Sequence, residues 1–225
     1  MTAETEASGP PPEAPRDCPL CPRLVAYRAA NAAKHPRWFN GAVPSWGDAP
    51  DAVRLLVIGL APGVSGANRT GRPFTGDAAG DLLYGTLIAR GLASGPYERR
   101  PDDALTLHGT MITNAVRCVP PENKPTGGEA RACRPYLLAR MAALPQLRAL
   151  LCLGKISHDS TLRSLGARVA THPFGHETEY ALEGPNGPLT LVSSYHCSRY
   201  NTNTGKLTPA MFERAVARAK AAAGL

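Results

Sequence analysis

The sequence lacks the features that mark membrane, secreted and disordered proteins. No apolar run approaches the roughly 18 residues that a transmembrane helix needs, so we expect no membrane partner. The first residues show no basic segment followed by an apolar one, which argues against a secretory signal. Charged residues make up only 19% of the chain, too few for a coiled coil or a disordered protein. Together these absences predict a cytoplasmic globular protein.

What the chain does contain points to one domain rich in loops. Its 225 residues compare with roughly 150 per domain, and 43% of them are hydrophobic, enough for a core. With 22 glycines and 22 prolines, many turns are expected. We expect a flexible Pro-rich tail over residues 1–16 and a single domain over residues 17–225. The net charge of +7 favours polyanions such as nucleic acid, although charge alone does not distinguish these from an acidic surface.

Short apolar segments alternate with helical patterns along the chain, which is typical of a parallel sheet covered on both faces. We expect strands over 54–59, 110–116, 149–153 and 189–195, and helices over 22–31, 77–90, 129–143, from 157 onward, and over 208–223. The fold class is therefore α/β. In such sheets ligands bind beyond the carboxyl ends of the strands. The segments GLAPGVSG, NAVRC and YHCSRYN follow three of these strands, so they should converge on one cleft.

The first of these segments opens a loop rich in glycine and proline, residues 59–80. Its glycines allow close approach of the backbone to a ligand. The loop lacks the Gly-Lys-Ser/Thr of a Walker A motif and the spacing of a Rossmann fingerprint. Asp77 is either the N-cap of the following helix or a chemical group. Phe74 is either core or a ring on which a base can stack.

Polar residues also follow the other two strands. Asn114 is either a turn former or an amide that reads a base edge, and Arg117 beside it would suit a phosphate. His196 lies where the polar groups gather. Cys197 does not fit a cysteine phosphatase, because the arginine required six positions later is Asn203. The basic and aromatic loop after it fits insertion into DNA, with a solvated loop as the alternative; its candidate residues are Arg199, Tyr200, Asn201 and Lys206.

Six cysteines in a reducing compartment favour metal or cluster ligation over disulfides. Cys18 and Cys21 form a C-x2-C pair that can offer two thiolates to one centre. Cys118 and Cys133 form a looser pair, and Cys152 in an apolar strand is expected to be an ordinary core residue. Spacing alone does not choose between zinc and an iron–sulfur cluster.

Taken in order, these motifs resemble the uracil-DNA glycosylase superfamily, specifically its iron–sulfur family 5. The order is C-x2-C, GLAPG, GxPFTGDxAG, N-x-V-R-C, Cys133, and then H-x-S with NTxTGKLT. The resemblance extends from Cys18 to the final helix. It implies a three-layer α/β/α sandwich around a four-stranded parallel sheet, and a monomer.

The resemblance also implies the reaction and the cofactor. A member of this family hydrolyses the N-glycosidic bond of uracil in DNA during base excision repair, and leaves an abasic site. Its substrate DNA would place it with the nucleoid. The ligands of a [4Fe–4S] cluster would be Cys18, Cys21, Cys118 and Cys133.

Residue roles follow from the matching motifs. Asp77 would activate or orient water, or stabilise the sugar cation, and His196 would hydrogen-bond the departing base. Asn114 would hold the base edge and Phe74 would stack on its face. The backbone amides of the first motif would complete the pocket; its residues are Leu60, Ala61, Pro62 and Gly63.

Two departures from the family pattern bear on specificity. Gly63 stands where alanine is common, and Cys197 stands where proline is common, so we expect a roomy pocket and altered loop mobility. Substrates beyond uracil, such as hypoxanthine, are therefore expected. The competing function is an iron–sulfur protein that binds or traps uracil-containing or abasic DNA without turnover. Covalent trapping in relatives uses a histidine after the first motif, and residues 68–74 contain none.

Overall fold

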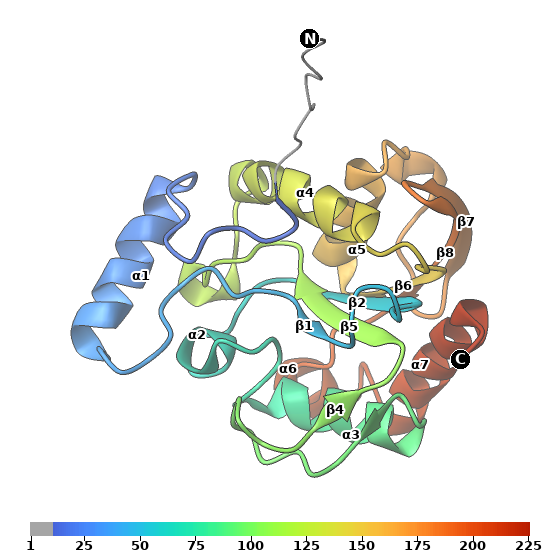
Figure 1. Ribbon diagram of the computed structural model, residues 1–225, viewed down its shortest axis with the longest axis horizontal. Helices are drawn as coiled ribbons and strands as arrows, with labels where there is room; N and C mark the ends of the chain where they lie inside the picture. Colours follow the sequence, from blue (N-terminus) through green and yellow to red (C-terminus); the bar gives the residue numbers. More distant parts are fainter. Residues whose placement is uncertain (1–10) are drawn as a thin grey trace, which may run out of the picture.

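The computed structural model describes residues 11–225, which form three layers around a central sheet (Figure 1). The strand order is β1-β5-β2-β6-β8-β7. The bounds are β1 Trp46–Gly47, β2 Leu55–Gly59, β5 Thr110–Asn114, β6 Ala149–Leu153, β7 Glu179–Gly184 and β8 Gly187–Ser194. A separate small sheet pairs β3 (Ala93–Ser94) with β4 (Thr106–Leu107).

The predicted four-stranded sheet is corrected to six strands. The four predicted strands do form a parallel unit, in the order β5-β2-β6-β8. At its two edges β1 and β7 add in antiparallel orientation. Neither edge strand is a continuous apolar run, because β1 has two residues and most residues of β7 are partly exposed. Their sequences therefore lack the signal that identified the buried strands.

Helices cover both faces of the sheet, which confirms the α/β/α sandwich. The helices are α1 Pro22–Lys34, α2 Ala67–Thr70, α3 Ala78–Ala89, α4 Gly127–Ala142, α5 Lys155–Ser164, α6 Arg199–Asn203 and α7 Pro209–Ala223. Two short 3-10 turns span Pro121–Asn123 and Val169–Thr171. In Figure 1, α4 and α5 lie on one side of the sheet, and α3 and α7 lie on the other.

Successive side chains of the central strand β2 point to opposite faces of the sheet, and each face has its own apolar cluster beneath the helices. Leu55 and Val57 of β2 belong to the apolar cluster that also contains side chains of α3 and α7. Leu56 and Ile58 point the other way, into the cluster with side chains of α4 and α5. All five residues of β2 are buried. This explains why the strand reads as a continuous apolar run and not as an alternating one.

The N-terminal part of the described chain packs against the domain. Ala14 is buried, and the Glu13 carboxylate accepts hydrogen bonds from Arg117 and Arg140. The structure thus describes the last six residues of the predicted tail, and residues 1–10 lie outside the described part. Among residues 11–225, no helix combines the length and apolarity needed to cross a membrane.

Candidate functional site

A cavity of about 710 Å³ opens where β2, β5 and β8 end. It collects residues from all three predicted segments, so the expected convergence at the carboxyl edge of the sheet is confirmed. The predicted residues among its lining are Leu60, Ala61, Pro62, Gly63, Phe74, Asp77, Asn114, His196 and Arg199. Pockets at this edge are the usual ligand sites of parallel sheets.

Asn114 and Phe74 meet above Gly59, the last residue of β2. A Cβ atom on Gly59 would lie 2.4 Å from Asn114 Oδ1 and 2.6 Å from the Phe74 ring. Only glycine therefore allows the amide and the ring to sit at this point. Asn114 is 2% exposed, and its Oδ1 has no hydrogen-bond partner within the described residues. A buried acceptor without a donor costs about 1–3 kcal/mol, so the structure presents a polar atom that a ligand can satisfy.

The backbone at Phe74 is strained. Its φ is +53°, in the left-handed region that is uncommon for residues other than glycine. The Tyr97 hydroxyl donates to the Phe74 carbonyl at 3.1 Å, and Gly80 leaves room for that carbonyl, since a Cβ on Gly80 would lie 1.8 Å from it. The ring lies 5.8 Å from that of His196, with 25° between their planes. Strain of this kind is concentrated at functional sites.

Asp77 is the N-cap of α3, as one of the two predictions had it, and it also lines the cavity. Its Oδ1 accepts hydrogen bonds from the backbone N–H groups of Ala79 (3.1 Å) and Gly80 (3.3 Å), which caps α3. Its Oδ2 faces the first-motif loop, where a Cβ atom would lie 3.0 Å away on Gly63 and 2.3 Å away on Gly66. One carboxylate oxygen is thus fixed by the helix, and the glycines make room for the other beside the cavity.

His196 is half-buried beside these groups. Its burial lowers the pKa of the imidazole below the ordinary value, and the nearby negative charge of Asp77 opposes that shift. The ring is therefore neutral at neutral pH, and a neutral imidazole can donate one hydrogen bond. Asn201 Nδ2 donates to the His196 carbonyl at 2.8 Å, and this hydrogen bond stabilises the loop that carries His196. Cys197 between them is fully buried in the core.

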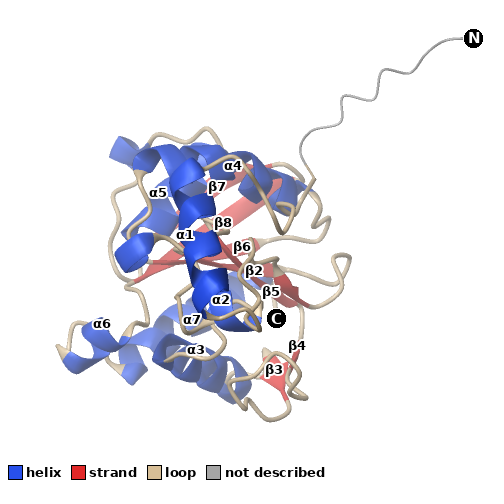
Figure 2. Cartoon of the chain, turned by 90° about the vertical axis from the view of Figure 1, so that its left-hand side faces the viewer, coloured by secondary structure: helices blue, strands red, loops and turns tan. Residues whose placement is uncertain are grey.

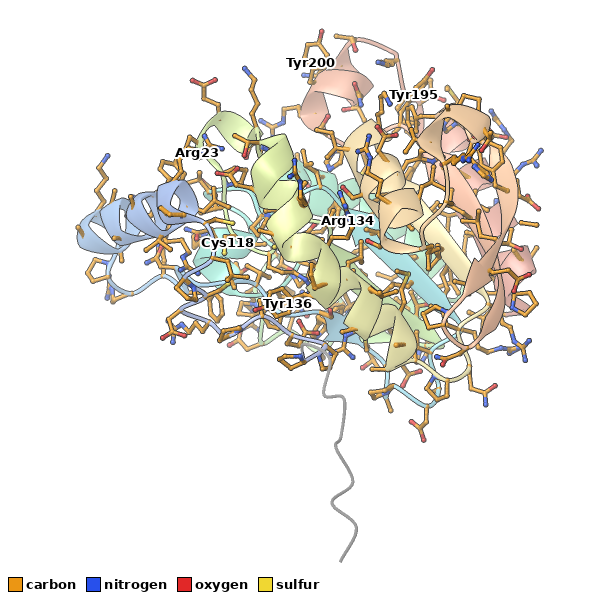
Figure 3. The ribbon with its side chains drawn as sticks, turned by 90° about the horizontal axis from the view of Figure 1, so that it is seen from above. Arg23, Cys118, Arg134, Tyr136, Tyr195 and Tyr200 are labelled. Carbon is orange, nitrogen blue, oxygen red and sulfur yellow. The ribbon has the colours of Figure 1, made fainter. Side chains whose placement is uncertain are left out.

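The remaining residues predicted to contact DNA lie on α6 or, in the case of Lys206, just after it. Figure 2 shows α6 standing away from the three layers at the edge of the molecule. Tyr200 on this helix is 75% exposed, and Figure 3 shows it at the periphery. Lys206 Nζ lies 4.9 Å from the centre of the Tyr195 ring. The amide of Asn201 is used within the loop, as described above, while Arg199 lines the cavity.

A second group of side chains brings together the four predicted cluster cysteines. Cys18, Cys118 and Cys133 are buried in one apolar cluster, and Cys21 packs against it. Figure 3 shows Cys118 between α1 and α4. All four are free thiols. Burial raises the pKa of Cys118 to about 12 and that of Cys21 to about 11, with further contributions from the other cysteines.

Two of these thiols accept hydrogen bonds from nitrogen donors. Arg28 Nη1 donates to Cys118 Sγ at 3.3 Å, and the backbone N–H of Arg117 approaches Cys133 Sγ at 3.4 Å. Such donors to sulfur tune iron–sulfur centres. Across residues 11–225, no three ligand-type side chains converge on a point that would hold one metal ion.

Two residues differ from the sequence interpretation. Arg117 does not face a phosphate: it is 1% exposed and is held by Glu13 Oε2 at 3.0 Å and Ser45 Oγ at 2.9 Å. Asn123 was not predicted, but it lines the cavity with a φ of +56°. The only sequence signal was its position after a Pro-Pro pair, which predicts a turn without indicating where it points.

Comparison with known proteins gives a consistent result. The family model described as Uracil DNA glycosylase superfamily matches residues 46–220. A type-5 uracil-DNA glycosylase from Thermus thermophilus is 47% identical over 92% of this chain and 94% of its own length. One from Pyrobaculum aerophilum is 37% identical over 92% and 90%. A type-4 enzyme from Pyrobaculum aerophilum is 35% identical over only 68% and 63%.

Proposed function

Because the chain belongs to the uracil DNA glycosylase superfamily, and to its type-5 branch, we propose a specific division of labour among its cavity residues. The protein is a uracil-DNA glycosylase of DNA repair, a hydrolase that acts on N-glycosyl bonds. The observation that best supports the division is the unpaired, buried Oδ1 of Asn114 beside the Phe74 ring. These two groups offer a base one hydrogen-bonding edge and one stacking face.

Asn114 recognises the edge of the flipped base. Uracil presents an N–H donor beside a carbonyl acceptor on its Watson–Crick edge, which match the Oδ1 and Nδ2 of an asparagine amide. Cytosine presents an amino donor where uracil has that carbonyl, so the same amide meets the wrong partners. A buried amide in this orientation therefore discriminates between the two bases, and Phe74 contributes stacking that depends little on the base.

Asp77 and His196 act on the bond that breaks. As the bond from the sugar C1′ to the base nitrogen lengthens, positive charge builds on the sugar and negative charge on the base. Asp77 Oδ2 stabilises the sugar cation and orients the water whose oxygen bonds to C1′. The neutral His196 donates a hydrogen bond to the base oxygen that gains charge. These are electrostatic contributions made by groups fixed in advance.

The size of the cavity supports activity on other deaminated bases. Its volume of about 710 Å³ lies within the range of sites for drug-sized ligands. Gly63 contributes no side chain to the wall, and among residues 11–225 a Cβ atom there would meet Asp77 Oδ2 and, apart from its chain neighbours, no other atom within 4 Å. We therefore extend the proposed substrates to hypoxanthine, a purine.

The four cysteines are proposed to hold a [4Fe–4S] cluster whose role is structural. When bound, the cluster cross-links three separate parts of the chain through iron–thiolate bonds. The protein already joins two of these parts: Arg23 of α1 forms a bidentate ion pair with Glu129, which caps α4 with Thr126. The cluster would thus secure the segment around Cys18 and Cys21 to the loop after β5.

DNA reaches the cavity across α6 in this proposal. Arg199 at the rim and the exposed Tyr200 provide a cation for a phosphate and a ring for a neighbouring base. Lys206 extends the same basic surface. The enzyme acts as a monomer, and its binding to DNA places it on the nucleoid.

Single-turnover cleavage of oligonucleotides with uracil or hypoxanthine, followed by alkali, tests the proposal. Strand breaks at uracil are expected, with slower breaks at hypoxanthine. Tight lesion-dependent binding without breaks would instead support the non-catalytic binder. The anaerobically purified protein should show visible absorption and close to four irons per chain. Stoichiometric zinc without colour would contradict the cluster.

A further inference from the structure

A second concave site lies beside the first, and nothing in the reaction described above uses it. It has a volume of about 450 Å³, and its lining includes Arg16, Arg37 and Arg69 together with Trp38 and Phe39. Three arginines and two aromatic rings in one hollow form an uncommon surface, because like charges repel one another. We refer to it as the arginine pocket.

Within residues 11–225, no carboxylate forms an ion pair with the three arginines of the arginine pocket. The arginine ion pairs of residues 11–225 involve other arginines, and none of these three takes part in one. Arg16 donates to the Phe39 carbonyl at 2.6 Å with its guanidinium 4.7 Å from the Phe39 ring centre. Arg69 Nε donates to the Ser65 carbonyl at 2.8 Å. Two cations are thus held in place by neutral groups and keep donors to spare.

The walls of the pocket are joined to the wall of the catalytic cavity. The segment after α1 passes beside α2 (Figure 1), and two backbone hydrogen bonds connect them, Phe39 N–H to Arg69 O and Asn40 N–H to Asn68 O, each 3.0 Å long. The residues just before α2 line the catalytic cavity, and its last two line the arginine pocket. A four-residue helix spans about 6 Å, so the two sites are close neighbours.

We propose that the arginine pocket binds a phosphodiester of the DNA strand that carries the lesion, on one side of the flipped nucleotide. Guanidinium groups match phosphate oxygens with two parallel hydrogen bonds, and aromatic rings accept neighbouring bases. A strand advances about 3.4 Å per nucleotide along a duplex axis, so it crosses α2 within roughly two to four nucleotides. The inference rests on the glycosylase function, since it takes the flipped base as its starting point.

Arg37 is the residue with which to test this, because it is exposed and the structure gives its side chain no hydrogen bond that a substitution would break. Arg148 is the matched control: it is also exposed, but it precedes β6 and so lies at the opposite, amino-terminal edge of the sheet. Two single-stranded oligonucleotides are required, each with 2′-fluoro-deoxyuridine, whose electron-withdrawing fluorine slows bond cleavage. One carries about six nucleotides on the 5′ side of the analogue and none on its 3′ side. The other carries about six nucleotides on the 3′ side and none on the 5′ side.

Fluorescence anisotropy at several salt concentrations then measures the dissociation constants. For Arg37→Ala we expect weaker binding of one of the two oligonucleotides by about fivefold at 0.1 M salt, with its salt slope reduced by roughly 0.7, and little change for the other. Arg148→Ala should bind both like the wild type. Equal losses on both oligonucleotides, equal losses in the two variants, or no loss for Arg37→Ala would overturn the proposal. Wild-type cleavage of the unmodified oligonucleotides is scored separately, so a failure of the glycosylase function is recognised as such.

Discussion

Replacement of Asp77 by asparagine separates its structural role from its chemical role. Asparagine caps helices about as well as aspartate, because its Oδ1 can accept the same hydrogen bonds from Ala79 and Gly80. With that oxygen used by the cap, the NH2 group takes the place of Oδ2. A donor then stands where the wild type has an acceptor with a negative charge, so it can neither accept a hydrogen bond from water nor stabilise a cation.

The expected magnitudes for the two roles are far apart. Loss of the cap in Asp77→Ala costs about 1 kcal/mol, which lowers the melting temperature of a domain of this size by roughly 2–4 °C. Asp77→Asn should lower it by less. Loss of a positioned acid–base group lowers the rate by roughly 10²–10⁴-fold, and this should occur in both variants.

Two assays on the same preparations decide the matter. Single-turnover rates on uracil-containing DNA report the chemistry, and thermal unfolding with anisotropy on uncleaved analogue DNA reports folding and binding. We expect Asp77→Asn to keep its affinity and stability but lose turnover. A rate within about threefold of the wild type would remove the carboxylate from the mechanism and leave Asp77 the role of a helix cap.

Three further perturbations address the rest of the site. Gly66→Ala places a Cβ 2.3 Å from Asp77 Oδ2 where real contacts stay above 3.0 Å, so the carboxylate must move by at least about 0.7 Å and the rate should fall by roughly 10–100-fold. Because burial lowers the pKa of His196, the acid limb of kcat/KM should lie below about pH 6.5, and His196→Gln should abolish that limb. The same shift means that the unfolded chain binds a proton at His196 more readily than the folded protein does. The free energy of unfolding should therefore fall as the pH drops below about 6.5. Glu13→Gln leaves the buried Arg117 without its counter-charge and should destabilise the fold by about 3–5 kcal/mol, which thermal unfolding measures.

Controls come from the same chain. Gly63→Ala puts its Cβ 3.0 Å from the same oxygen, so its effect on the rate should be much smaller than that of Gly66→Ala. Glu122→Gln breaks an exposed pair with Lys124 and should change stability by less than about 0.5 kcal/mol. Comparable losses in the paired variants would refute the arguments from close contact and from burial, respectively. A pH profile of His196→Gln that retains the acid limb would assign that limb to another group.

The parallel core could be predicted because its strands are buried on both faces. In a strand such as Leu55–Gly59 both faces are buried, so the side chains on both faces must be apolar. The sequence therefore shows a continuous apolar run. The edge strand Glu179–Gly184 has only one buried residue and carries no such constraint. It pairs with β8 through a two-residue connection, Pro185 and Asn186. These are turn-forming residues between two glycines, so the sequence carries a signal for the turn although it carries none for the strand.

For the site, the sequence identified residue types but not their partners. Asp77 was correctly placed before a helix, yet its second oxygen depends on two glycines of a different loop. Arg117 follows the end of a strand, as a ligand-binding residue would. Its guanidinium is instead buried in an ion pair with Glu13, 104 positions earlier in the sequence. Asn123 enters the cavity through a turn whose direction is set by tertiary packing. Long-range contacts of this kind decide which strand-end groups face a ligand.

The ion pairs of Glu13 also set an order of assembly for the molecule. Glu13 precedes its partners Arg117 and Arg140 by 104 and 127 positions. Cys18 likewise waits for Cys133 on α4. During synthesis, the N-terminal segment can therefore make these contacts only after Arg140 has been added to the chain. Until then the Glu13 carboxylate and the thiols of Cys18 and Cys21 lack these partners, so docking of this segment depends on contacts that are distant in the sequence.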